Sequence, residues 1–136
     1  MGWSNPKAPY NAILCHIKSK GIRVYHREIK SGACGLFDCR KMIITISKDL
    51  KNTYEGCGVL CHELSHFCDY QEGKFLKFFE ERLTEKDLDL IIKAEMSAIK
   101  NAVKLSKMWE IQYSPPELTK KGFDESVEFW KKYYFQ

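Results

Sequence analysis

The chain has 136 residues, 44% hydrophobic and 29% charged, so it is long enough for one ordinary hydrophobic core and short for two. Its formal net charge is +4, but the basic residues are scattered rather than gathered into a block, which is typical of a solvated surface. No run approaches the roughly 18 apolar residues that a membrane span needs. We therefore expect a single domain over residues 1–136 that binds neither nucleic acid nor a membrane.

Six cysteines would suggest three disulfides in a secreted protein. Three of them, Cys57, Cys61 and Cys68, recur at helical spacing on the same stripe as core-facing leucines, which is typical of small buried thiols. In the alternative interpretation these thiolates bind zinc. They lie on the side of the helix away from the two histidines of the same segment, however, so they could not share a metal with them. Because the N-terminus also lacks a secretory apolar segment, we predict a reduced, cytoplasmic protein.

The first predicted elements are one helix and three strands. The helix runs from Pro9 to Lys20, because apolar residues recur at helical spacing and Gly21 can cap its end. The pattern then alternates with a period of two, and two polar breaks divide it, so we predict a three-stranded sheet with two tight connections. His26 lies in the first strand as a core residue, a surface residue or a helper at a catalytic site. The expected strands cover residues 22–29, 34–37 and 42–47.

The next predicted helix carries the motif His62-Glu63-Leu64-Ser65-His66, which has the form H-E-x-x-H. It begins after Asn52 or Thr53, either of which can cap it, and it ends near Tyr70. Residues four apart lie on the same face of a helix, so both imidazoles can reach one cation while Glu63 lies on its solvent side. The motif predicts a zinc site of the peptidase kind; the alternative is an ordinary helix with two surface histidines.

A second long helix is predicted from Thr84, at a capping-box sequence, to about Glu110. The segment before it, residues 75–82, is expected to be a loop or short helix whose phenylalanines cover the core. Glu95 lies inside the apolar stripe of the long helix, between Ile92 and Ile99. A carboxylate that faces a core destabilises the fold by several kcal/mol unless it is paired or binds a cation. The two-histidine site offers such a partner.

The third metal ligand is expected to be acidic, because catalytic zinc uses three protein ligands and no histidine follows His66. Asp69 and Glu72 lie within a turn or two of His66, a spacing that seldom wraps back onto the same ion. We favour Glu95, supplied by a second helix packed across the first. The full set of candidates is Asp69, Glu72, Glu80, Glu81, Asp87, Asp89 and Glu95.

The expected chemistry is peptide-bond hydrolysis with Zn²⁺ as cofactor. Zinc lowers the pKa of its bound water towards about 7, and Glu63 can accept the proton and pass it to the leaving amine. The anionic intermediate requires a hydrogen-bond donor besides the metal. Tyr70, Tyr113, His26 and a tail tyrosine are candidates that the sequence does not separate.

The C-terminal segment, about residues 115–136, is predicted to form an amphipathic helix with an aromatic face after Ser114-Pro115-Pro116. Docking against the domain is one interpretation of this helix. In the other interpretation it covers the cleft, and the protein is a latent or non-catalytic, zinc-stapled binding or regulatory module.

His62-Glu63-Leu64-Ser65-His66 followed by Glu95-Met96-Ser97-Ala98 resembles the gluzincin zinc metallopeptidases. Residues 33–38 leading to residues 42–46 make the chain most similar to the small ImmA/IrrE-type peptidases. This resemblance implies a minimal zincin-like α+β domain, in which the sheet packs on an active-site helix and a long glutamate-bearing helix. It also implies an intracellular zinc metalloendopeptidase whose protein substrate is a repressor-type regulator. Ser65 departs from this pattern, because a glycine is common at its position. Minimal gluzincins whose own C-terminal segment blocks the cleft are a second resemblance.

Overall fold

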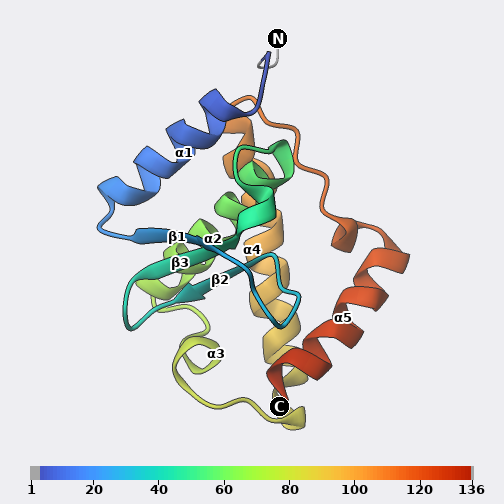
Figure 1. Cartoon of the computed structure of the whole chain (residues 1–136). Coiled ribbons are helices and arrows are strands. Elements are labelled where there is room, and N and C mark those ends of the chain that lie inside the picture. Colours follow the sequence, from blue (N-terminus) through green and yellow to red (C-terminus); the bar gives the residue numbers. More distant parts are fainter. Residues whose placement is uncertain (1–3, 136) are drawn as a thin grey trace.

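The computed structural model describes residues 4–135, and in this part of the chain it shows an α+β fold of five α-helices and one three-stranded sheet (Figure 1). Helix α1 (Lys7–Ser19) buries Tyr10 and Ile13 completely and ends before Gly21, whose φ of +83° suits glycine. The helix predicted from Pro9 is confirmed and begins two residues earlier. Within the described residues, no helix is both long and apolar enough to cross a bilayer.

The three predicted strands are confirmed, but their predicted connections are partly wrong. The spatial order is β1-β3-β2: β1 pairs parallel with β3, and only the β2–β3 connection is a tight antiparallel turn. A parallel pair cannot be joined by a hairpin, so the chain passes from β1 to the far edge of the sheet before it returns. β3 takes the centre because it is the most apolar strand, with Ile44 and Ile46 fully buried. The strands are β1 (Arg23–Arg27), β2 (Gly35–Asp38) and β3 (Ile43–Ser47).

Helix α2 (Tyr54–Gln71) forms the centre of the fold. Its cap is Thr53, whose hydroxyl oxygen accepts a hydrogen bond of 2.8 Å from the Gly56 amide, as the sequence predicts. The core face includes Leu60 and Leu64, which are at most 1% exposed. All six cysteines are free, and Cys57 and Cys61 are buried as expected, whereas Cys68 is only half-buried near the end of the helix.

The chain then forms the short helix α3 (Leu76–Glu80), and the long helix α4 (Leu88–Met108) packs along α2. The predicted capping box is present between Thr84 and Asp87. Asp87 is buried, and its carboxylate accepts a hydrogen bond from the Thr84 amide and pairs with Lys77 at 2.8 Å. α2 and α4 make the most extensive contact in the described fold, so side chains on their facing surfaces are held firmly.

Helix α5 (Lys120–Tyr134) follows the short 3₁₀ helix η3 (Pro116–Leu118). Figure 1 shows α5 apart from the sheet, with its C-terminal end beside α4. Among its described residues only Gly122 and Trp130 are buried. The predicted helix of residues 115–136 is therefore present but begins at Lys120; its last residue, Gln136, lies outside the described part of the chain.

Candidate metal centre

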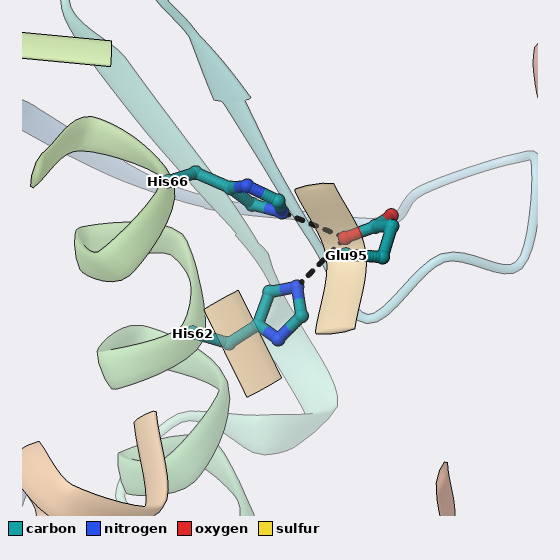
Figure 2. Close-up of side chains that lie close together, drawn as sticks. All are labelled: His62, His66 and Glu95. Atoms are coloured by element: carbon teal, nitrogen blue, oxygen red, sulfur yellow. Dashed lines mark hydrogen bonds and ion pairs between the residues drawn. The ribbon is translucent and has the colours of Figure 1, made fainter. Parts of the chain in front are cut away.

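Helices α2 and α4 bring three side chains to one point (Figure 2). His62 and His66 lie one turn apart on α2, and Glu95 faces them from α4. The Glu95 Oε1 atom lies 3.2 Å from His62 Nε2 and 2.7 Å from His66 Nε2. The helical period explains this convergence, because an i, i+4 pair on one helix and a core-facing carboxylate on its packing partner share one interhelical space.

The donor set fits a zinc ion. In the part of the chain that the structure describes, His62, His66 and Glu95 form the one group of three or more potential ligands, and their ligand atoms lie within 4.8 Å of one another. Zinc bonds of about 2.0–2.1 Å in a tetrahedral arrangement place neighbouring ligand atoms roughly 3.4 Å apart. Shifts within the flexibility of these side chains therefore bring the two imidazoles and the carboxylate into coordination distance. Two nitrogens and one carboxylate oxygen also leave a fourth position for water.

The remaining acidic candidates lie elsewhere or have other partners. Asp69 is buried on α2, but its carboxylate accepts a hydrogen bond of 2.9 Å from the Ser97 hydroxyl. The Asp87 carboxylate accepts a hydrogen bond from the Thr84 amide and pairs with Lys77. Glu72 pairs with Lys74 at the surface. Glu95 is thus the acidic residue that the fold brings to the two histidines.

Charge within the group is strongly coupled. Burial lowers the pKa of His62, but the hydrogen bond to Glu95 and the charges of Glu63 and Glu95 outweigh it and raise the pKa to about 9. Burial alone would raise the pKa of Glu95, whereas His66 and His62 hold it well below its usual range. The cluster therefore favours an ionised carboxylate beside positive charge, which is the balance that a bound cation satisfies. The Nδ1 atom of His66 is buried without a hydrogen-bond partner in the described chain.

Glu63 lies beside this group and is 5% exposed, without a hydrogen bond or ion pair to another described residue. Burial raises the pKa of its carboxyl, while the neighbouring His62 and His66 lower it and Glu95 adds to the rise. The carboxyl lies against the start of β2, because a Cβ atom at Gly35 would stand 3.0 Å from its Oε2 atom. A buried carboxylate so placed can accept a proton from a group at the metal position.

The metal group opens onto a cavity of about 700 Å³. One wall consists of α2, α3, α4 and β2, and the other consists of η3 and α5 together with the segment that precedes them. His62, Glu63, His66 and Glu95 all line the first wall. Aromatic side chains from both walls share the cavity: Phe37, Tyr54, Phe78, Phe79, Tyr113, Phe129, Trp130, Tyr133 and Tyr134.

Of the predicted hydrogen-bond donors for an anionic intermediate, Tyr113 and the tail tyrosines Tyr133 and Tyr134 line the cavity among the described residues. His26 lies on the sheet, where its Nε2 atom is 2.8 Å from the Tyr10 hydroxyl. Tyr70 packs against Phe37 and Phe79 without reaching the cavity. Neither His26 nor Tyr70 is therefore among the described residues that line the cavity.

One contact was missed from the sequence. The Tyr134 hydroxyl donates a hydrogen bond of 2.7 Å to Glu95 Oε2, the carboxylate oxygen that the histidines do not contact. Phe78 stacks on the His66 ring, with centroids 5.6 Å apart, and also contacts Tyr134. The aromatic face of the tail was the available signal, but such a face is equally typical of a helix that only docks.

No family model, curated protein or solved structure matches this chain.

Proposed function

We propose that the protein is a zinc-dependent metallopeptidase of the gluzincin type that hydrolyses peptide bonds in a protein substrate. The observation that carries the proposal is the convergence of His62, His66 and Glu95 in a cavity wall, with the buried Glu63 beside them. The H-E-x-x-H spacing gives each residue a defined role. Two imidazoles and Glu95 hold the ion, and Glu63 serves as the general base.

The chain's own groups supply the proton transfers. A bound zinc ion would provide a polarising charge and lower the pKa of a coordinated water towards about 7. Glu63 is suited to accept the proton of this water and hand it to the leaving amine, because its raised pKa makes both steps accessible. Tyr113 can donate a hydrogen bond to developing negative charge, since burial raises the pKa of its hydroxyl and keeps it protonated.

The cavity also suits a polypeptide rather than a small molecule. β2 pairs with β3 along one edge, and its residues Gly35, Leu36 and Phe37 line the cavity. An extended peptide can add to such a strand edge through main-chain hydrogen bonds, which recognise any sequence. A zincin-like fold of the small ImmA/IrrE type accounts for this arrangement, and the resemblance suggests a repressor-type regulator as the substrate.

The test is Glu63→Gln in the full chain. We expect the variant to retain one zinc per chain by elemental analysis, because Glu63 is not a ligand, and to lose about 10²–10⁴-fold in peptidase rate on an unfolded protein substrate. Glu72→Gln, an exposed residue at the end of the same helix, is the matched control and should keep full activity. An active, zinc-loaded Glu63→Gln variant would contradict the proposed mechanism.

A latent or non-catalytic module is the second candidate, and the bond from Tyr134 to Glu95 favours it, since α5 lies across the cavity from the metal group. Deleting residues 119–136 separates the two. A latent enzyme gains activity on deletion, because its cleft opens. An enzyme that uses α5 as a substrate wall loses activity, and a non-catalytic module shows no hydrolysis in either form.

A further inference from the structure

The cavity has a charge character opposite to that of the whole chain. The protein carries 22 Lys and Arg residues and a net charge of +4, yet none of the described residues that line the cavity is a lysine or arginine. Its acidic lining residues come from four separate elements or their ends, so the bias is a property of the fold rather than of one segment. They are Glu55, Glu63, Glu95, Glu117 and Glu125.

Two of these carboxylates, Glu55 and Glu117, line the cavity outside the metal group. Glu55 lies in the first turn of α2, seven residues before His62 and on the same helix face. It is exposed and makes no hydrogen bond or ion pair with another described residue. Glu117 lies on η3 in the opposite wall and is half-buried. Glu125 is further out and faces Lys121 at 4.0 Å, so part of its charge is compensated.

Glu117 is held in a fixed position. Its Oε2 atom accepts a hydrogen bond of 2.8 Å from the Ser126 hydroxyl on α5. Gly122 packs against the Pro116 carbonyl so closely that a Cβ atom at this glycine would clash with it. The 3₁₀ turn and the start of α5 therefore form one tightly packed corner, and the second carboxylate oxygen of Glu117 remains available to a ligand.

The charges of Glu55, Glu63 and Glu117 all affect one side chain in the cavity, that of Tyr113. Burial raises the pKa of Tyr113, and the charges of Glu117, Glu63 and Glu55 raise it further. The Tyr113 ring, packed on Gly58 of α2, thus lies within the field of all three. Glu63 is itself more than nine-tenths buried, unpartnered and directed into the cavity. A cation held by Glu95 offsets charge at the centre, which leaves Glu55 and Glu117 as uncompensated negative charge beside it.

The spacing sets a distance from the reaction centre. Seven residues of α-helix span about 10 Å, which is the length of about three residues of an extended peptide. We propose that Glu55 and Glu117 form a subsite that selects a lysine or arginine side chain two or three residues from the scissile bond, so that the substrate is a basic polypeptide segment. This inference rests on the proposed peptidase function.

The test uses quenched fluorescent peptides that differ at one position, where Lys, Gln or Glu is placed at each of the four residues on either side of a common cleavage site. With the zinc-loaded full chain, we expect kcat/KM about tenfold higher for Lys than for Gln at one position two or three residues from the cleavage site. The preference should shrink as salt is raised and nearly disappear in the Glu55→Gln, Glu117→Gln double variant. Glu85→Gln is the control, because it removes one negative charge, as each subsite substitution does, from an exposed residue outside the cavity. It should retain the full preference for Lys.

Binding separates the two proposals. The same peptides are titrated by fluorescence anisotropy against zinc-loaded Glu63→Gln protein, with and without the two subsite substitutions. Hydrolysis with equal rates for Lys, Gln and Glu peptides would overturn the basic subsite and leave the peptidase proposal intact. If no peptide is hydrolysed, the peptidase proposal fails. In that case, about tenfold tighter binding of the Lys peptide that is lost in the double variant still supports the basic subsite. Equal binding of the Lys, Gln and Glu peptides overturns the basic subsite.

Discussion

The two walls of the cavity are built differently. In the wall made by α2 and α4, the apolar residues beneath the cavity are almost completely inaccessible: Leu60, Leu64, Ile91 and Ile99 are at most 1% exposed. In the opposite wall, α5 buries Gly122 and Trp130 among its described residues, and Phe129 is 38% exposed. The first wall is buried along its length, whereas the second is mostly exposed and joins the core through Trp130, which shares a buried cluster with Ile91 and Ile99.

This difference matches the division of chemical roles. His62, Glu63, His66 and Glu95 all belong to the first wall, where dense packing fixes the positions of these side chains. The second wall contributes Glu117 of the proposed basic subsite and Tyr134, whose hydroxyl bonds to Glu95. The proposed metal ligands and the proposed base are therefore concentrated in the densely packed wall. The next three experiments test this division.

The largest expected effect is on stability. Ile99→Ala, in the centre of α4, should lower the free energy of unfolding by about 2–5 kcal/mol, because the cavity that it leaves lies between tightly packed helices. Phe129→Ala on α5 should change it by about 0.5 kcal/mol or less, because a large part of that ring already faces solvent. Urea denaturation of both variants measures the contrast. Equal losses would show that α5 belongs to the cooperative core.

The next effect concerns the metal. Glu95→Ala should weaken zinc binding by more than about a hundredfold, since it removes a ligand rather than a neighbour of one. Competition with a chromogenic chelator measures the affinity. Asp69→Ala is the matched control, because Asp69 is a buried acidic residue on α2 that bonds to Ser97 instead. Unchanged affinity in Glu95→Ala would remove the third ligand from the proposal.

A smaller effect is expected from the second wall. Tyr134→Phe removes the hydroxyl that donates to Glu95 Oε2 and should weaken zinc binding about tenfold, the lower end of the range for groups that orient a ligand. Tyr133→Phe is the control, because Tyr133 lines the same cavity and makes ring contacts with its neighbours. Tighter zinc binding in Tyr134→Phe would show instead that the tyrosine competes with the metal for Glu95.

The sequence predicts the first wall much better than the second. The cap at Thr53, the capping box at Thr84 and the position of Glu95 on a buried stripe follow from rules that operate within one or two helical turns. The convergence of Glu95 with His62 and His66 follows from two such local patterns, because a buried carboxylate requires a partner.

What the sequence does not predict depends on contacts between distant segments. The parallel pairing of β1 with β3 is decided by which strand can be buried on both faces, and not by the turn residues between strands. Tyr134 lies 39 residues after Glu95, and nothing in the periodicity of α5 indicates which of its aromatic residues meets the carboxylate. The sequence left the role of His26 open for the same reason: its partner is the Tyr10 hydroxyl on α1.

The smallest expected effect lies outside both walls, at this Tyr10–His26 bond. Burial raises the pKa of Tyr10, so the hydroxyl keeps its proton and can donate a hydrogen bond to Nε2 of the neutral His26 ring. Burial, followed by the charges of Lys51 and Lys18, lowers the pKa of His26. The folded state therefore binds a proton at this site more weakly than the unfolded chain. The stability linked to the neutral His26 ring is fully present above the ordinary histidine pKa of about 6.5 and is lost as the pH falls from there through the lowered pKa of the folded state.

His62 has the opposite sign, since its pKa is raised to about 9 and its contribution is present at low pH and lost as the pH rises through that value. A comparison of metal-free wild type with metal-free Tyr10→Phe cancels the pH-dependent contribution of His62 to stability, because both proteins retain His62. By urea denaturation, Tyr10→Phe should be less stable than wild type by about 1 kcal/mol at roughly pH 7.5, and the difference should shrink at a pH below the lowered pKa of His26, where the protonated ring can no longer accept the hydrogen bond. If the stability difference is the same at both pH values, the contribution of the Tyr10 hydroxyl does not depend on the protonation state of His26.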